Sequence, residues 1–151
     1  MNRRTFLSGL LVLAANAWAL ANTAYAEQTI ETEHYTVHYN AFNSTAIAPQ
    51  SAQENGIVRS KYSALLNIAV FNNENGKPTT PSTALIQGEA RNRLGQVQTL
   101  RFTSIKEGSA QYYLSEFTFA NEEELSFDLT VQPDPNKAAI PLRFKQTFFT
   151  D

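Results

Sequence analysis

Two histidines, His34 and His38, are the side chains best suited to hold a metal or move a proton, and they lie four positions apart. On a helix this spacing would place both imidazoles on one face, as in a zinc-binding pair. The flanking residues alternate as in a strand, however, and four strand residues span about 13 Å. Because zinc lies about 2 Å from each ligand nitrogen, the two rings cannot share one ion. We predict two solvent-facing histidines and no metal site, with a pH-responsive patch as the alternative.

The sequence contains no other recognisable catalytic or cofactor-binding motif. The chain has no cysteine, which excludes thiolate metal sites and a cysteine nucleophile. It contains no G-x-S-x-G or Ser-x-x-Lys set, and no glycine-rich phosphate loop that would indicate a nucleotide cofactor. Carboxylate pairs for glycoside chemistry stay open, because such residues meet only in three dimensions. We predict no catalytic residue and no cofactor, and therefore a noncatalytic protein rather than an enzyme.

Basic residues gather in one part of the sequence, at Arg91, Arg93, Arg101 and Lys106. They would suit an anion-binding patch. The expected strand register places Arg91 and Arg101 on an outward face with Glu89 between their strands, which favours exposed cross-strand ion pairs. We therefore predict a solvated face here.

Two adjacent aromatic pairs are harder to bury. Neighbouring residues of a strand point to opposite faces, so one member each of Tyr112-Tyr113 and Phe148-Phe149 is expected on an outer face. An exposed aromatic patch would indicate a surface for a partner. The candidate interaction surface predicted from the sequence consists of His34, His38, Tyr39, Tyr112, Tyr113 and Phe149.

The first 26 residues have the pattern of an export signal. Arg3 and Arg4 precede an apolar run, which ends at Ala24-Tyr25-Ala26, a small-x-small cleavage site. The run is too interrupted for a membrane anchor. We predict cleavage before Glu27, a single domain over residues 27–151 and a periplasmic location without a stable anchor. The general secretory and twin-arginine routes both stay open.

Composition limits the partners and the source of stability. The net charge is −2, and losing the leader's arginines makes the mature chain more acidic, which disfavours nucleic acid as a partner. The only methionine and tryptophan, Met1 and Trp18, lie in the leader. An exported domain without disulfides must be stabilised by apolar burial.

Apolar residues of the mature chain alternate with period two, and turn signals recur every ten to fifteen residues. We predict an all-β fold, an immunoglobulin-like antiparallel β-sandwich of about seven strands. Residues 62–71 are apolar on both faces and predict a central strand, whereas residues 72–82 are expected to be irregular. A three-residue hairpin loop is predicted at 93–95 with Gly95 last, and a β-bulge near Ser115-Glu116. Gly88 is expected to make room for a side chain of the opposite sheet.

Several segments together resemble a family of small exported proteobacterial proteins known as a domain of unknown function. They are His38-Tyr39-Asn40, Asn43-Ser44-Thr45, Arg59-Ser60, residues 64–71, GEARNRLGQ (88–96), IKEGSAQYYL (105–114), Asn121-Glu122-Glu123 and FKQTFFTD (144–151). The resemblance implies a periplasmic, immunoglobulin-like sandwich. It carries over no catalytic or binding residue.

Three functions follow as hypotheses. The first is a noncatalytic periplasmic binding or interaction module whose partner is another envelope protein. The second is a small-ligand carrier or a hydrolase-type enzyme with a pocket lined by Tyr, His and carboxylates. The third is a metal-dependent module holding zinc or copper.

Overall fold

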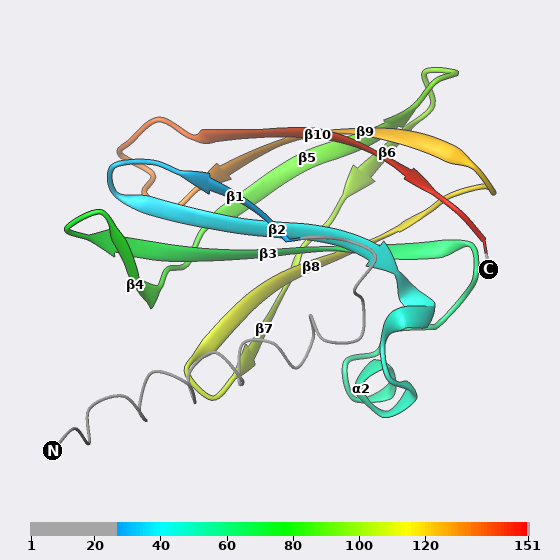
Figure 1. Cartoon of the computed structure of the whole chain (residues 1–151), viewed down its shortest axis with the longest axis horizontal. Helices are drawn as coiled ribbons and strands as arrows, with labels where there is room; N and C mark the ends of the chain where they lie inside the picture. Colours follow the sequence, from blue (N-terminus) through cyan, green and yellow to red (C-terminus); the bar gives the residue numbers. More distant parts are fainter. Residues whose placement is uncertain (1–26, 151) are drawn as a thin grey trace, which may run out of the picture.

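The computed structural model describes residues 27–150, which form two antiparallel sheets packed face to face (Figure 1). This confirms the predicted all-β sandwich, although it has ten strands where about seven were expected. The leader predicted over residues 1–26 lies outside the described residues. Among those that are described, none of the helices has the length and apolar character needed to cross a membrane.

The larger sheet has six strands, in the order β1-β2-β3-β8-β7, with β4 also paired to β3. Its strands are β1 (Gln28–Glu31), β2 (Tyr35–Asn43), β3 (Ser63–Glu74), β4 (Lys77–Pro81), β7 (Thr103–Glu107) and β8 (Ala110–Thr118). β3 is central, as its two apolar faces predicted. It pairs with β2 along one side, and with β8 and β4 in succession along the other.

The smaller sheet has four strands, in the order β10-β9-β5-β6. Its strands are β5 (Leu85–Asn92), β6 (Val97–Leu100), β9 (Glu123–Gln132) and β10 (Ile140–Phe148). Two short helices, η1 (Ser44–Ala46) and α2 (Pro49–Glu54), join β2 to β3 and project from one end of the larger sheet (Figure 1).

The core lies between the sheets and is rich in aromatic side chains. The rings of Phe127 and Phe144 are stacked with centroids 4.4 Å apart, and Phe117 contacts Phe148 edge to face at 5.2 Å. Each fully buried side chain of this size contributes about 1.5 to 3 kcal/mol through the hydrophobic effect. Gln146 adds a polar link, since its Nε2 donates a hydrogen bond to the Ala41 carbonyl of the opposite sheet at 3.0 Å.

The β5–β6 hairpin forms in the predicted register. The backbone N–H of Asn92 donates to the carbonyl of Gln96 at 3.1 Å, so residues 93–95 form the loop. Gly95 has φ of +83°, a conformation that glycine adopts at little cost.

Gly88 corrects one expectation. It pairs with Leu100 as predicted, but also with Leu129 of β9. A Cβ at this position would meet β9 of the same sheet, at 2.7 Å from the Leu129 Cα and closer still to the Asp128 carbonyl oxygen. The glycine therefore makes room for the backbone and the Leu129 side chain of the neighbouring strand β9, and not for a side chain from the opposite sheet.

Two further expectations about local structure were wrong. Residues 72–82 were expected to be irregular, but β4 pairs with the end of β3 through a turn at Asn75-Gly76, where both residues have positive φ. β8 contains no bulge, because its pairing with β3 is regular throughout. Tyr113 and Phe117 face the core, and Tyr112 and Leu114 face outward, so the apolar residues of this strand simply occupy both faces.

The extended segment after the hairpin loop is divided between the two sheets. β6 ends at Leu100 in the smaller sheet, and β7 begins at Thr103 in the larger one. Arg101 and Phe102 form the crossing, and both β6 and β7 are edge strands. This crossing brings Arg101 to the rim of the larger sheet.

Candidate functional site

The outward side of the larger sheet carries an unusual set of residues, which we call the six-strand outer face. One row runs across Asn40, Asn67, Leu114 and Thr103, as the strand register shows. A second row contains His38 paired with Ala69, and Tyr112 paired with Ile105. The first row has two amides and a leucine, and the second has apolar and aromatic side chains beside His38. Leu114 is 6 % exposed and Ala69 7 %, so this face is not a simply solvated one.

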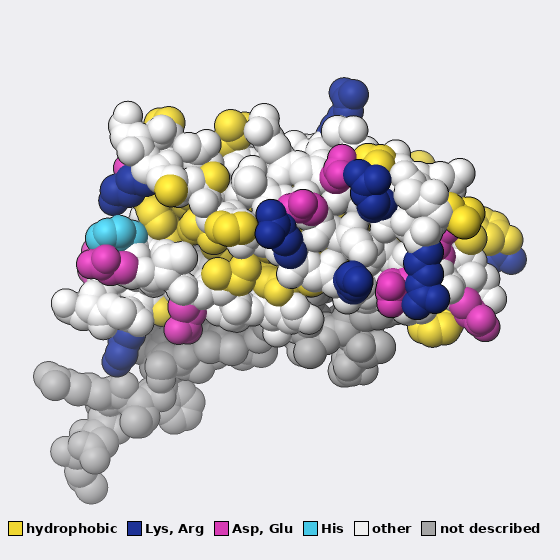
Figure 2. All heavy atoms as spheres, turned by 90° about the horizontal axis from the view of Figure 1, so that it is seen from above, with side chains coloured by type: hydrophobic (Ala, Val, Ile, Leu, Met, Phe, Trp, Pro, Cys, Tyr) yellow, Lys and Arg dark blue, Asp and Glu magenta, His cyan; other side chains and the backbone are white. Residues whose placement is uncertain are grey.

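The outward side of the smaller sheet is different. Figure 2, a view from above Figure 1, shows basic and acidic side chains interspersed. Two of its ion pairs are Arg91 with Glu89 at 3.0 Å and Arg143 with Asp128 at 3.1 Å. Charges of both signs on an exposed sheet face are typical of a solvated surface. The two outer faces therefore differ in chemistry, and the six-strand outer face is the candidate for binding.

The two histidines lie apart. His34 lies in the β1–β2 turn, where its exposed ring is 3.8 Å from the Glu33 carboxylate. His38 lies on the six-strand outer face, where its Nδ1 is 2.8 Å from the Glu27 carboxylate and 3.2 Å from the Thr29 hydroxyl. The hydrogen bond to His38 lowers the pKa of the Glu27 carboxyl, against an opposing effect of burial.

Two of the tyrosines predicted for the interaction surface face the core. Tyr39 is 8 % exposed and packs on Phe144, with ring centroids 5.1 Å apart. Burial raises the pKa of its phenol. The Tyr113 hydroxyl accepts hydrogen bonds from the Ala84 backbone N–H at 3.0 Å and from Gln111 Nε2 at 3.1 Å. Their polar ends are thus used within the fold.

The other members of the aromatic pairs point outward. Tyr112 lies on the six-strand outer face but is 7 % exposed, and burial, followed by the charges of Glu107 and Glu27, raises the pKa of its phenol. Phe149 is 48 % exposed beyond the end of β10. The six residues predicted as one surface therefore divide among the core, the six-strand outer face and the two ends of the sandwich.

A groove of about 590 Å³ opens on the six-strand outer face. Leu65, Leu114 and Ile105 provide apolar lining from β3, β8 and β7. The segment Asn55-Gly56-Ile57, directly after α2, forms one side, and Arg101 with Lys106 contributes positive charge from the β7 side. The segment keeps its position because Ile57 packs on a small second core that includes Phe42, Ile47, Ala52 and Leu65.

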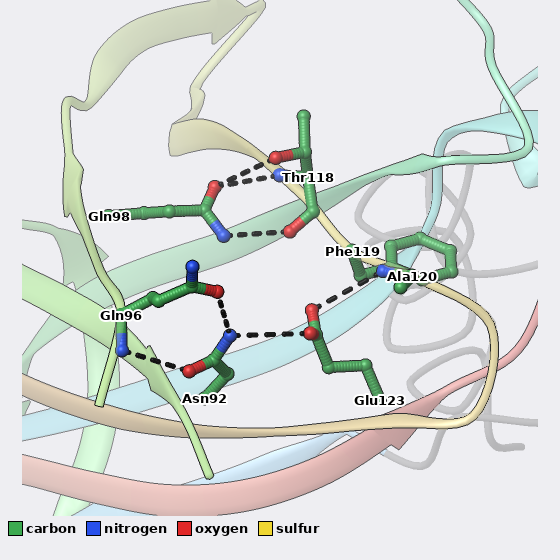
Figure 3. Close-up of a pocket in the computed structure, with 7 residues that line it drawn as sticks. All are labelled: Asn92, Gln96, Gln98, Thr118, Phe119, Ala120 and Glu123. Atoms are coloured by element: carbon green, nitrogen blue, oxygen red, sulfur yellow. Dashed lines mark hydrogen bonds between the residues drawn. The ribbon is translucent and has the colours of Figure 1, made fainter. Parts of the chain in front are cut away.

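A smaller pocket of about 260 Å³ lies between the β5–β6 hairpin and the β8–β9 turn, and its lining is polar (Figure 3). The carboxamide of Gln98 is bonded to Thr118 three times, at 2.7 Å to its carbonyl, 2.9 Å to its N–H and 3.2 Å to its hydroxyl. Asn92 donates to Gln96 at 2.7 Å, and the Glu123 carboxylate accepts from the Ala120 N–H at 3.3 Å. These groups satisfy one another, so the pocket joins the two sheets and offers few free groups to a ligand.

Within residues 27–150, no three His, Asp or Glu side chains gather where they could hold a metal ion. One acceptor on the six-strand outer face lacks a partner: the Oδ1 of Asn67 is buried without a hydrogen bond, although its Nδ2 lies 3.5 Å from Asn40 Oδ1. Buried polar atoms are nearly always hydrogen-bonded. The Asn67 oxygen is therefore an acceptor on this face that no other group of the described chain uses.

Comparison with known proteins agrees with the resemblance found in the sequence. Residues 29–151 match the family described as Domain of unknown function (DUF4426). The chain belongs to this family. The crystal structure of a DUF4426 family protein from Pseudomonas aeruginosa PAO1 is 33 % identical, with a TM-score of 0.69 over 83 % of this chain and 96 % of that one. No curated protein matches the chain.

Two more distant structures share the fold of this DUF4426 domain. FetP of uropathogenic Escherichia coli strain F11, expressed recombinantly in the periplasm of E. coli, is 10 % identical with a TM-score of 0.58, over 85 % of this chain and 98 % of that one. A copper-bound variant of the same FetP is 11 % identical with a TM-score of 0.55, over 82 % and 95 %. At this level of identity the likeness concerns the fold alone.

Sequence reasoning missed the residues that line the groove of the DUF4426 domain. Arg101 was assigned to a solvated cross-strand pair, because the division between β6 and β7 was not predicted. Leu114 was not among the predicted surface residues; a bulge was expected near Ser115-Glu116, and the regular pairing found there places Leu114 on the outer face. The available signal was that Tyr113, Phe117 and Phe119 occupy one phase of the alternation, interrupted by Ser115 alone, which leaves Tyr112 and Leu114 for the outer face.

Proposed function

We propose that the domain is a noncatalytic binding module of the periplasm, and that the six-strand outer face is its binding surface. The observation that carries this proposal is the difference between the two outer faces. The smaller sheet presents paired charges, such as Arg143 with Asp128, whereas the larger sheet presents apolar and amide groups beside a groove. A periplasmic location is supported by the leader pattern and by FetP, which was expressed in that compartment.

A small-ligand carrier is the form of binding module that the groove favours. Its volume of about 590 Å³ lies within the range of about 300 to 1,000 Å³ typical of small-molecule sites. Its lining combines the apolar side chains of Ile57, Leu65, Ile105 and Leu114 with a larger number of polar ones, so a ligand would be held mainly by polar contacts. Another envelope protein, the partner expected from the sequence, would then exchange the ligand with this domain.

Site-specific photo-crosslinking in cells tests the proposed surface. A photoreactive residue would replace Thr103, which is exposed on β7 beside the groove, and in a matched control Thr130, which is exposed on the outer side of β9. We expect one discrete adduct from position 103 and none from position 130. Equal labelling from both positions, or adducts from position 130 alone, would contradict the proposal.

Native mass spectrometry of protein purified from the periplasm tests the carrier form. We expect a bound species of small mass that is lost when position 103 is changed to tryptophan, because the larger ring would fill the groove. If native mass spectrometry detects no bound species and position 103 gives no crosslinked adduct, the result would count against any binding role for this face.

A further inference from the structure

One edge of the larger sheet is open to a further strand. β7 is the last strand of the order β1-β2-β3-β8-β7, and within residues 27–150 no strand pairs with its outer side (Figure 1). Four successive residues of β7, 103–106, line the groove. Because successive side chains of a strand point to opposite faces, a groove lined by four in a row must run along the edge of the strand, where the backbone is exposed.

The other edge strands are shorter or contain proline. Natural sheets protect their edges with short strands and with proline, which cannot donate to a ladder. β1 and β6 have four residues each. β4 contains two prolines, and β10 contains Pro141. β7 has five residues and no proline, and it is therefore the edge most open to pairing.

The β7–β8 hairpin decides which backbone groups of β7 face outward. Glu107 pairs with Ala110 across a two-residue loop, and the residues that close such a loop form a hydrogen-bonded pair. Bonded pairs alternate along an antiparallel ladder, so every second residue from 103 to 107 bonds to β8. The N–H and C=O groups of Ser104 and Lys106 therefore point to the open edge.

We propose that β7 pairs with β7 of a second copy of this chain, antiparallel, so that Ser104 of one copy lies opposite Ser104 of the other. In this register Arg101 of each copy lies opposite Glu107 of the other, and two pairs of opposite charge form across the strands. Lys106 lies opposite Phe102 and meets no second cation. A register with the two Lys106 residues opposite each other would bring like charges together, and a register centred between these two positions would pair no opposite charges.

The two charged residues lie on the same face of β7. Arg101 lines the groove together with Thr103, a residue of the six-strand outer face. The charge of Glu107 contributes to the raised pKa of Tyr112, which lies on that face too. Both Arg101 and Glu107 are exposed. Within the described residues Arg101 forms no ion pair, whereas three other arginines each lie 3.0 to 3.4 Å from a carboxylate.

The pairing goes beyond the proposed function, because it requires no ligand in the groove. It would join the six-strand outer faces of two copies into one continuous sheet surface. Since residues 103–106 line the groove, the second chain would lie directly beside it. The contact involves far fewer residues than the 20 to 30 a side of a standard interface, so we expect a weak dimer.

A single introduced cysteine tests the register directly, because the chain contains none. The Cα atoms of a bonded antiparallel pair lie about 5.5 Å apart, within the roughly 4.4 to 6.8 Å that a disulfide spans. We expect Ser104→Cys, purified from the periplasm, to run as a linked dimer in nonreducing electrophoresis. Thr103→Cys is the matched control. Its two copies would be two residues out of register, about 8 Å apart, and should stay unlinked.

Exchange of the charges tests the same register without a crosslink. Sedimentation velocity is measured up to about 500 µM, as a contact of this size requires. Arg101→Glu and Glu107→Arg each place like charges opposite one another twice, and each should weaken the dimer by about tenfold or more. The double variant restores opposite charges and should recover the dimer to within about threefold. Arg143→Glu makes the same change in net charge on the smaller sheet and should leave the dimer unchanged. Melting temperatures check that every variant folds.

The inference is overturned if the natural chain is monomeric throughout this range and Ser104→Cys gives no linked dimer. It is also overturned if Thr103→Cys links as efficiently as Ser104→Cys, or if the folded double variant fails to recover the dimer. The proposed function is tested separately. A photo-crosslinked adduct between position 103 and another protein, in a chain that is monomeric, would keep the binding face and reject the second copy. A dimer that binds no other protein and no ligand would keep the pairing and reject the proposed function.

Discussion

Replacing Gly88 with alanine tests the packing of the smaller sheet. The added Cβ would lie 2.7 Å from the Leu129 Cα and nearer still to the Asp128 carbonyl oxygen. Both are backbone atoms of β9, so the strain cannot be relieved by turning a flexible side chain. Overpacking in a tight interior commonly costs about 1 to 3 kcal/mol, and a contact with backbone should lie near the upper end. We therefore expect the free energy of unfolding to fall by about 3 kcal/mol.

Urea denaturation followed by far-UV circular dichroism measures this loss. Because the only tryptophan is Trp18, a protein consisting of residues 27–151 offers no tryptophan fluorescence. With an m value of about 1 to 3 kcal/mol/M, the midpoint should fall by about 1 M or more. Two variants calibrate the result: Gly95→Ala, where φ is +83° and no atom is close, should cost about 1 kcal/mol. Gln87→Ala, at an exposed neighbouring position, should cost less than about 0.5 kcal/mol.

The explanation for Gly88 is tested by comparing the losses in unfolding free energy of the three variants Gly88→Ala, Gly95→Ala and Gln87→Ala. If Gly88→Ala is no more destabilising than Gly95→Ala, the close approach of β9 to β5 is not what requires glycine, and the explanation given for Gly88 is refuted.

Three more predictions follow from contacts within the sandwich. Gln98→Ala removes three hydrogen bonds between the sheets and should lower the unfolding free energy by about 1 to 2 kcal/mol, against the small effect of Gln87→Ala in the same urea assay. Tyr113→Phe removes a hydroxyl that accepts two hydrogen bonds and should cost about 1 kcal/mol; an unchanged melting temperature would contradict this. Because the phenol pKa values of Tyr39 and Tyr112 are raised in the folded state, their contribution to stability is complete below pH of about 10 and is lost as the pH rises through their folded-state values. Ultraviolet titration should show these two phenols ionising after the exposed tyrosines, and simultaneous ionisation would refute the assignment.

Local patterns predicted those parts of the fold in which one face is apolar and the other polar. Residues 125–131 of β9 alternate without exception, and the structure buries Leu125, Phe127, Leu129 and Val131. The β5–β6 hairpin was predicted because its loop chemistry and its core pattern agree. In these segments a shift of one residue would expose the whole apolar set, so the sequence determines the register.

Patterns failed where position in the fold decides the structure. β4 contains Pro78 and Pro81 and little apolar surface, yet it forms because the end of β3 offers unpaired backbone groups that the β8 pairing has left. The change of sheet at Arg101-Phe102 could not be predicted from the sequence, because the alternation of apolar and polar residues continues through these positions without a break. Prediction of the candidate site was the least successful. The groove is formed by β3, β7, β8 and the segment after α2, which are far apart in the sequence.

The passage of residues 97–107 from one sheet to the other has a consequence for how the domain comes apart. The layers share a continuous stretch of backbone, reinforced where Gln98 holds Thr118. Separation of the two sheets would break the pairing of the edge strands β6 and β7. We therefore expect the two sheets to unfold together, in one cooperative transition. The slowest-exchanging amide protons of β3 and β9 should then report one common free energy.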